Sequence, residues 1–349
     1  MNIEGFVKIG TRTKELIKYL TSDDIAIIQH DDIDILAAEA LINSRIKAVV
    51  NTGRSMTGRY FSRGTALLVT NNIKLYDVNI NIAAFKDSDF VRIKGKDLIL
   101  NNKYLFTNSC LAVNLEYIQQ KHLACSSNYN SLLHEFIDNT LLYAEKEKKS
   151  LIDFGSYPEI NSNINGRCAI VVVRSSESKD ALLGLRSFID NNNPILIGVD
   201  GGADTIISCG RTPDILIGDM DSVSDVGIFR SKEIILHTYM DGRCPCIDRI
   251  ASLNVKYKLL AMPGTSEDVA LLLAYDKGAA KIILIGGHNC MTDFLERDRK
   301  GMGSTLIAKF KIEDRLIDYK HIKKLQDLVG INEPLHYSDN EGDLLWMKM

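Results

Sequence analysis

The sequence predicts an α/β protein in which a smaller mixed α/β domain and a helical connector precede a doubly wound, mostly parallel sheet. Three observations lead to this fold class. Short, continuously apolar runs recur between residues 161 and 330, helical stretches separate them, and no low-complexity tract interrupts the 349 residues. Continuously apolar strands that alternate with helices are typical of parallel sheets covered on both faces.

The domain predicted at residues 161–330 has the clearest pattern. Its predicted strands are Cys168–Val173, Ile195–Val199, Ile215–Ile217, Ile234–Leu236, Lys258–Ala261 and Lys281–Ile285, and its predicted helices are Lys179–Asp190 and Asp268–Lys277. In sheets of this kind, ligands bind beyond the carboxyl ends of the strands. Functional residues are therefore expected directly after these apolar runs.

Residues 1–110 are interpreted as the mixed α/β domain. Their apolar patterns predict strands at Asp24–Ile28, Lys47–Val50 and Ala66–Val69, and a helix over Asp34–Ile42. From Phe85 to Tyr104 the pattern changes to short alternating strands separated by turn residues.

Residues 111–160 form the predicted helical connector. Apolar residues such as Leu115, Ile118 and Leu132 fall at helical intervals, and the charge run Glu145–Lys149 follows them. Two interpretations stay open: a connector or dimerisation helix of a homodimer, or plain packing against a neighbouring domain. Residues 331–349 are expected to be a polar tail.

The composition limits the class of partner and the compartment. Forty-two basic residues against forty-five acidic ones give no electrostatic basis for binding nucleic acid. No apolar stretch approaches the ~20 residues of a membrane helix, Leu344–Met347 included. Met1–Gly5 lacks the basic and apolar regions of a signal peptide. Seven scattered cysteines, of which only Cys244 and Cys246 are close in sequence, indicate reduced thiols. A cytoplasmic protein is expected.

Carboxylates and glycines follow two of the predicted strands. Asp200-Gly201-Gly202 comes directly after Ile195–Val199, and its glycines would let backbone N–H groups approach an anion. Asp219 and Asp221, followed by Ser222, come after Ile215–Ile217, and two such acids can converge on Mg²⁺. An ordinary turn in the first case, and a solvated acidic turn or helix cap in the second, are the alternative interpretations.

The third acidic strand end is Gly264-Thr265-Ser266-Glu267-Asp268, which precedes an apolar helix. Thr265 suits an N-cap and Asp268 the third helical position, so a near-capping box is the structural interpretation. Acids and glycines at three strand ends of one predicted sheet favour a shared ligand site over three unrelated turns.

These motifs resemble known families. Asp200-Gly201-Gly202-Ala203, Pro213-Asp214 and Gly218–Ser222 resemble the nucleotide-binding domain of thiamine pyrophosphokinases. Five further segments extend the likeness to the SteA-type proteins of cell division, in which such a domain follows an N-terminal domain. They are Asn51–Tyr60, Thr238–Arg243, Gly264–Asp268, Phe294-Leu295 and Gly301–Thr305.

The resemblance implies a set of ligands. In thiamine pyrophosphokinases, the acids matching Asp200, Asp219, Asp221 and Asp268 lie at Mg²⁺ and the nucleotide phosphates. It thus implies ATP or another nucleotide with Mg²⁺, metal contacts from Asp200, Asp219 and Asp221, and catalytic roles for Asp221 and Asp268 if the protein is active. The cofactor-binding residues that it implies are Asp200, Gly201, Gly202, Asp219, Asp221, Ser222, Thr265, Ser266, Glu267 and Asp268.

The chain also departs from the kinase pattern. Gly264–Asp268 lacks both lysines of the kinase motif Lys-Asp-Lys-Thr-Asp. Gly286–Met291 matches a second kinase motif, Gly-Gly-Arg-x-Asp-His, but lacks its arginine, aspartate and histidine. Thiamine pyrophosphokinases also carry a C-terminal β-sandwich that helps bind thiamine, and the residues after Gly303 are expected to be too few for one. Replacement cations are sought in Arg243, and in the trio Arg297, Arg299 and Lys300, with exposed loop charges as the alternative interpretation.

Other charged residues are weaker candidates. Arg54, Arg59 and Arg63 form a second candidate anion site, against the interpretation of an ordinary glycine-containing loop. His288 suits a structural hydrogen bond better than catalysis, and turn chemistry explains Asp241 and Asp293 equally well.

The leading hypothesis is a SteA-like protein that binds a Mg²⁺–nucleotide or pyrophosphate ligand. Its role would be regulatory or scaffolding in cell division or the cell envelope, with a partner protein and without a membrane segment in this chain. The alternative is an active Mg²⁺-dependent diphosphokinase that transfers pyrophosphate from ATP to a thiamine-like hydroxyl. A third hypothesis is a pure interaction module with an empty crevice.

Overall fold

The computed structural model describes residues 2–11 and 13–321, so the predicted polar tail lies outside the described residues. The chain divides into two compact units. Unit 1 comprises residues 1–137 and 290–300, and unit 2 comprises residues 138–289 and 301–349. The sequence-based boundaries at about 110 and 160 bracket a long helix, whereas this division falls inside the helix and assigns a short later segment to unit 1.

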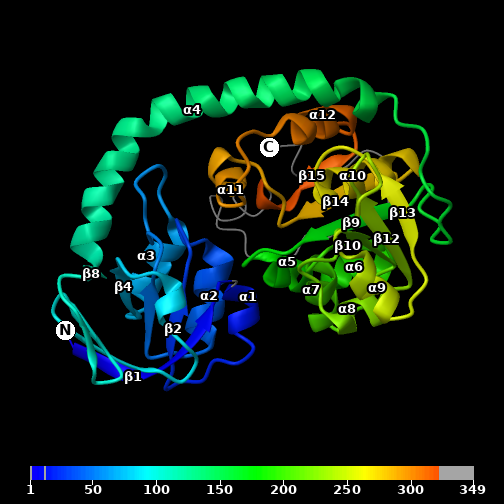
Figure 1. Ribbon diagram of the computed structural model, residues 1–349. Coiled ribbons are helices and arrows are strands. Elements are labelled where there is room, and N and C mark those ends of the chain that lie inside the picture. The colour runs from blue at the N-terminus through cyan, green and yellow to red at the C-terminus, as the bar shows by residue number, and fades with distance from the viewer. Residues whose placement is uncertain (1, 12, 322–349) are drawn as a thin grey trace. The chain divides into compact units, whose positions relative to one another are not determined.

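Unit 1 contains an eight-stranded mixed sheet in the order β7-β6-β5-β1-β2-β3-β4-β8. Figure 1 labels β1, β2, β4 and β8 of this sheet. The strands are β1 (Asn2–Gly10), β2 (Ile25–Ile28), β3 (Ala48–Asn51), β4 (Lys74–Val78), β5 (Phe90–Lys94), β6 (Asp97–Leu100), β7 (Tyr104–Phe106) and β8 (Cys110–Val113). Strands β1 to β4 are mutually parallel, and β5 and β8 join them in antiparallel fashion. The predicted short strands after Phe85 are confirmed as β5, β6 and β7.

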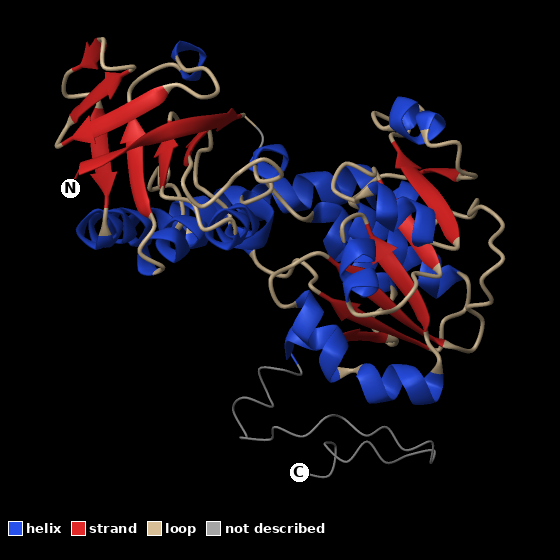
Figure 2. Cartoon of the chain, turned by 90° about the horizontal axis from the view of Figure 1, so that it is seen from below, coloured by secondary structure: helices blue, strands red, loops and turns tan. Residues whose placement is uncertain are grey.

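The two faces of this sheet are buried in different ways. Ala26 and Ile28 of β2 pack with the helices, which are α1 (Thr13–Leu16), α2 (Ile35–Asn43) and α3 (Arg63–Thr70). Ile25 and Ile27 face the other side and pack with residues of β5 and β6, because the sheet curls over itself. Figure 2 shows these helices on one side of the strands.

The strand predicted at Ala66–Val69 is wrong, since these residues lie in helix α3. Ser62 is the N-cap, and its side chain accepts a hydrogen bond from the Thr65 backbone N–H. Only one side of the run is fully buried, with Leu68 inside and Leu67 half-buried. Four apolar residues are too few for periodicity to separate a strand from a buried helix turn. The strand of this region is β4, which begins at Lys74.

The predicted connector is one helix, α4 (Leu115–Ile152). Phe136 packs against Phe294 in unit 1, with ring centroids 6.0 Å apart. In unit 2, the backbone of α4 at Thr140 and Ala144 lies directly against Gly301 and Gly303. The choice between a dimerisation helix and packing against a neighbouring domain stays a prediction. Among the described residues, no helix combines the length and apolar character needed to cross a membrane.

Unit 2 contains a seven-stranded, fully parallel sheet in the order β13-β12-β11-β10-β9-β14-β15. The strands are β9 (Cys168–Val173), β10 (Ile195–Val199), β11 (Ile215–Gly218), β12 (Glu233–Thr238), β13 (Lys258–Ala261), β14 (Lys281–Ile285) and β15 (Leu316–Asp318). The six strands predicted by the apolar runs are thus confirmed, as is the doubly wound parallel sheet.

Helices cover both faces of this sheet. The helices are α5 (Ser178–Gly184), α6 (Arg186–Asn192), α7 (Gly202–Ser208), α8 (Asp225–Arg230), α9 (Ile247–Ser252), α10 (Ser266–Asp276) and α12 (Gly303–Lys311), while α11 (Met291–Leu295) belongs to unit 1. Val171 and Val173 of β9 pack with α10 and α12, and Ile170 and Val172 pack with α5 and α6. The strand order reverses between β9 and β14, which makes the carboxyl ends of these strands the topological switch point.

Candidate functional site

The turn after β10 is held by close contact with β9 and β11. A side chain at Gly202 would overlap the carbonyl oxygen of Val172, and a side chain at Gly218 would overlap the carboxylate of Asp200. Asp200 has a positive φ of 47°, and its Oδ1 accepts a hydrogen bond of 2.9 Å from the Met220 backbone N–H. Both glycines are therefore required by packing, and Asp200 joins the β10 and β11 turns.

The turn after β11 exposes its two acids. The Asp221 N–H donates to Asp219 Oδ1 over 3.0 Å, while the intervening Met220 is fully buried. Ser222 Oγ accepts a hydrogen bond of 3.1 Å from the Gly201 N–H. The predicted residues of these two turns are thus in contact, and Asp219 and Asp221 present carboxylates at the surface.

Helix α9 fixes the β11 turn from the other side. Arg249 on this helix donates hydrogen bonds to the carbonyl oxygens of Met220 and Val223, at 2.6 and 2.9 Å. Burial raises the pKa of the Cys246 thiol, at the start of α9, to about 12; the neighbouring Cys244 and then the charge of Asp219 add to this shift.

Arg174 is a further candidate site residue, which the sequence pattern does not indicate. It follows the last residue of β9, and an ideal Cβ on Gly201 would lie 2.7 Å from its Cδ and 3.1 Å from the Ser222 carbonyl oxygen. The half-buried Arg174 forms no ion pair or side-chain hydrogen bond with any described residue. Its position directly after the first apolar run was visible in the sequence. Its place at the switch point was not, because that depends on strand order.

The predicted capping box of α10 is confirmed. Thr265 accepts from the Asp268 N–H, and Asp268 Oδ2 accepts from the Thr265 N–H at 2.9 Å. The Ser304 hydroxyl donates to the same Oδ2 over 2.7 Å, and Oδ1 has no hydrogen-bond partner among the described residues. Asp268 is completely buried, and burial, followed by the charge of Glu267, raises its pKa. Asp268 thus lies beneath the surface of the edge, unlike Asp219 and Asp221.

Glu267 connects α10 to the end of β14. Its carboxylate lies 2.6 Å from His288 Nδ1 and accepts the His288 backbone N–H. Lys309 donates to the carbonyl oxygen of His288 at 3.0 Å. His288 is therefore held by structural bonds, as expected. Ser266 Oγ lies 3.2 Å from Nδ1 of His237, a residue of β12, and is within hydrogen-bond distance of it.

The predicted residues form two groups at the carboxyl ends of the sheet. Asp200, Gly201, Asp219, Asp221 and Ser222 share the β10 and β11 turns, and Arg174 lies against Gly201. A second group lies at the start of α10, beside the end of β14; it consists of Thr265, Glu267, Asp268, His288 and Ser304. Among the described residues, no three or more histidine, cysteine or carboxylate side chains form a ready metal-binding cluster.

The candidate replacement cations are assigned as follows. Arg243 pairs with Asp241 in its own turn over 2.6 Å and stacks on Tyr239. This ion pair agrees with the interpretation of Asp241 and Arg243 as turn residues. The trio Arg297, Arg299 and Lys300 belongs to the 290–300 segment of unit 1, whereas the acidic turns belong to unit 2.

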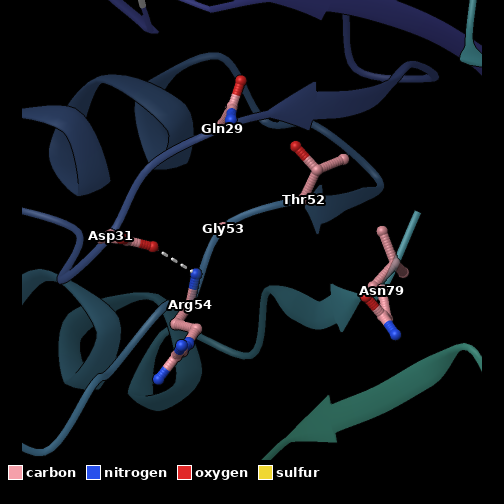
Figure 3. Close-up of a pocket in the computed structure, with 7 residues that line it drawn as sticks. Gln29, Asp31, Thr52, Gly53, Arg54 and Asn79 are labelled. Atoms are coloured by element: carbon pink, nitrogen blue, oxygen red, sulfur yellow. Dashed lines mark hydrogen bonds between the residues drawn. The ribbon is translucent and has the colours of Figure 1, made fainter. Parts of the chain in front are cut away.

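The three arginines of the second candidate anion site have separate environments. Arg63 pairs with Asp293 and Glu296, and Arg59 pairs with Glu135. Arg54 lines a cavity of about 680 Å³ at the carboxyl ends of β2, β3 and β4 (Figure 3). The other residues that line it are Gln29, Asp31, Thr52, Gly53, Val78 and Asn79.

This cavity is shaped by close backbone contacts. The Arg54 N–H donates to Asp31 Oδ1 over 2.7 Å, as the dashed line in Figure 3 marks. A side chain on Gly53 would lie 2.8 Å from the same Oδ1. Beneath it, Asn51 bonds to both backbone polar groups of His30 and to Ser55 Oγ. The glycine is thus needed for close approach, and the walls of the cavity are polar.

Comparisons with known proteins give a limited likeness. No protein-family model matches the chain, and no curated protein matches it. Among solved structures, the chain is similar to the crystal structure of thiamine pyrophosphokinase from Bacillus subtilis, with 21% sequence identity and a TM-score of 0.28. The similarity covers 43% of this chain and 60% of that one, so the chain spans less than two thirds of that protein.

Proposed function

We propose that unit 2 binds the polyphosphate of a nucleotide, together with Mg²⁺, at the turns after β9, β10 and β11. The observation that carries the proposal is Arg174, a half-buried guanidinium that pairs with no described residue and lies against Gly201 at the switch point. Arginine forms strong, bidentate hydrogen bonds with phosphate, so an arginine that lacks a protein partner here is suited to an anionic ligand.

The neighbouring acids suit the metal. Asp219 and Asp221 are exposed in one turn, and Mg²⁺ is typically held by one or two carboxylates, with phosphates and water completing the shell. The donor set therefore fits Mg²⁺ brought in by a polyphosphate. When bound, the ion would neutralise phosphate charge. Asp200 is bonded to the β11 turn and would position these acids.

The role that we propose is regulatory or scaffolding, as in a SteA-like cytoplasmic protein acting with a partner in cell division or the cell envelope. It rests on the motif resemblance and on the two kinase motifs that lack their cations. The burial of Asp268 supports binding without transfer, because a completely buried carboxylate cannot contact a substrate hydroxyl in this conformation.

Calorimetric titration with Mg²⁺-ATP and Mg²⁺-GTP tests the proposal. Arg174→Ala should weaken binding by about 10- to 100-fold, the loss of one or two charge-assisted hydrogen bonds. Arg230→Ala is the matched control, since Arg230 is exposed at the end of α8 and should leave the affinity unchanged. Absence of heat with both nucleotides, for the unaltered protein, would overturn the proposal.

An assay for AMP release distinguishes the regulatory role from the diphosphokinase alternative. Incubation with ATP, Mg²⁺ and thiamine should release no AMP if unit 2 only binds nucleotide. AMP release that Asp221→Asn abolishes would establish transfer and contradict the scaffolding role.

A further inference from the structure

Two cysteine side chains are in contact in the loop between β12 and α9. Cys244 Sγ and Cys246 Sγ lie 3.3 Å apart, and both thiols are free. A disulfide requires sulfurs at about 2.05 Å, so closure needs them to approach by about 1 Å more. Among the seven cysteines, all of which lie in the described residues, no other two are in sulfur contact. This pair is therefore the place in the molecule where an intramolecular disulfide can form.

The two thiols differ in access to solvent. Cys244 is half-buried, in a loop whose neighbouring residues Arg243 and Pro245 are exposed. Cys246 is only 9% exposed and packs in the core with Leu236 and Ile250. A reagent from solution can thus reach Cys244 first, while Cys246 is held behind it at contact distance.

We propose that Cys244 and Cys246 form a dithiol site that exchanges with a small-molecule disulfide such as glutathione disulfide. The Cys244 thiolate attacks one sulfur of the reagent, which breaks its S–S bond and expels one thiolate. The Cys246 sulfur then attacks Cys244 Sγ, gives up its proton to solvent and expels the second thiolate. The two protein thiols are oxidised by two electrons, and the reagent is reduced to two thiols.

The site is connected to the turn that carries Asp219 and Asp221. Cys246 packs in the same apolar cluster as Met220 and Val223. Helix α9, which begins after Cys246, holds the carbonyl oxygens of both residues through Arg249. Closure of the disulfide shifts the start of α9 and so changes the β11 turn. This part of the inference rests on the proposed nucleotide site, whereas the dithiol chemistry does not.

Mass spectrometry of the full chain tests the exchange. After incubation with glutathione disulfide, the peptide that contains both cysteines should lose two hydrogens. Cys246→Ser should instead retain glutathione on Cys244, and Cys244→Ser should leave Cys246 unmodified. Cys290→Ser, at an exposed cysteine with no neighbouring thiol, should close the disulfide normally. A pair that stays reduced while Cys290 becomes glutathionylated would overturn the proposal.

Two measurements on the oxidised protein test the connection to the turn. Amide hydrogen exchange of residues 218–224 should become faster, and Mg²⁺-ATP should bind at least about 5-fold more weakly than to the reduced protein. If oxidation changes neither the amide hydrogen exchange of residues 218–224 nor the affinity for Mg²⁺-ATP, the connection between the dithiol site and the β11 turn is refuted. If neither the reduced nor the oxidised protein binds nucleotide but oxidation still changes the amide hydrogen exchange, the proposed function fails. The dithiol site and its effect on the β11 turn then stand.

Discussion

Arg63 and Glu296 are 233 residues apart in the sequence and form a two-pronged ion pair, in which Nε and Nη2 each lie 2.9 Å from a carboxylate oxygen. The same Nη2 also lies 2.9 Å from Asp293 Oδ1. The acids are 10% and 7% exposed, so the segment that carries them is fixed on α3 by nearly buried charges.

Replacing Arg63 by alanine should destabilise unit 1, because two nearly buried carboxylates lose their counter-charge. Removing one partner of a buried pair costs about 3–5 kcal/mol, and the partial exposure of Arg63 reduces the expected loss to about 2 kcal/mol. Arg63→Lys should recover only part of it, since an ammonium cannot form the two-pronged contact. Urea unfolding measures the loss. Arg59→Ala, which removes an exposed pair with Glu135, should cost less than about 1 kcal/mol, and equal losses would contradict the prediction.

Gly202→Ala should destabilise unit 2 by about 3 kcal/mol, because the new methyl group overlaps the Val172 carbonyl oxygen, which is part of the backbone of β9 and cannot move aside. The matched control is Gly155→Ala, whose added methyl has no atom within 4 Å. The control should change the free energy of unfolding by less than about 0.5 kcal/mol. A Gly202→Ala protein as stable as the control would show that the β10 turn tolerates displacement.

Asp77 should make unit 1 less stable as the pH rises. Burial raises the pKa of Asp77 to about 6, from 3.8, and outweighs the hydrogen bonds from Ser55. Because the folded state holds this proton more tightly than the unfolded state, the contribution of Asp77 to the free energy of unfolding is greatest below pH 4 and is lost as the pH rises through 6. The loss is about 3 kcal/mol. Asp77→Asn keeps an acceptor for Ser55 and should not show this fall. Denaturation from pH 4 to 7 measures the difference, and parallel curves for the two proteins would refute the assignment.

Glu233 should give the opposite pH dependence in unit 2. Burial alone would raise its pKa, but hydrogen bonds from Lys258, Ser162 and the Asn161 N–H outweigh it and lower the pKa to about 2, from 4.5. The resulting stability, about 3 kcal/mol, is present above pH 4.5 and is lost as the pH falls through 2. Glu233→Gln should lack this loss and be less stable at pH 7. Thermal unfolding between pH 2 and 6 measures this difference. If the melting temperature of the variant falls at low pH as steeply as that of the unaltered protein, the prediction is wrong.

The sequence predicts what depends on local pattern. The strands of unit 2 are predictable because each is a continuous apolar run bounded by turn residues. The capping box is predictable because its two residues, Thr265 and Asp268, are only three positions apart in the sequence. The pattern of Ala66–Val69 suggests a strand although these residues are helical, because four residues do not reveal a period. Arg174 was missed since its importance follows from the position of β9 beside β14, a pairing of segments more than 100 residues apart. The metal and nucleotide contacts of Asp200, Asp219 and Asp221 stay predictions.

The chain passes between the two units three times, after residues 137, 289 and 300. No single backbone cut can therefore separate them. A fragment that begins at Asp138 carries Asp293, Phe294 and Glu296 with it but leaves behind Arg63 and Phe136, and so exposes an aromatic side chain and two unpaired acids. Unit 1 is therefore complete only after residues 290–300 have been synthesised, when most of unit 2 has already left the ribosome.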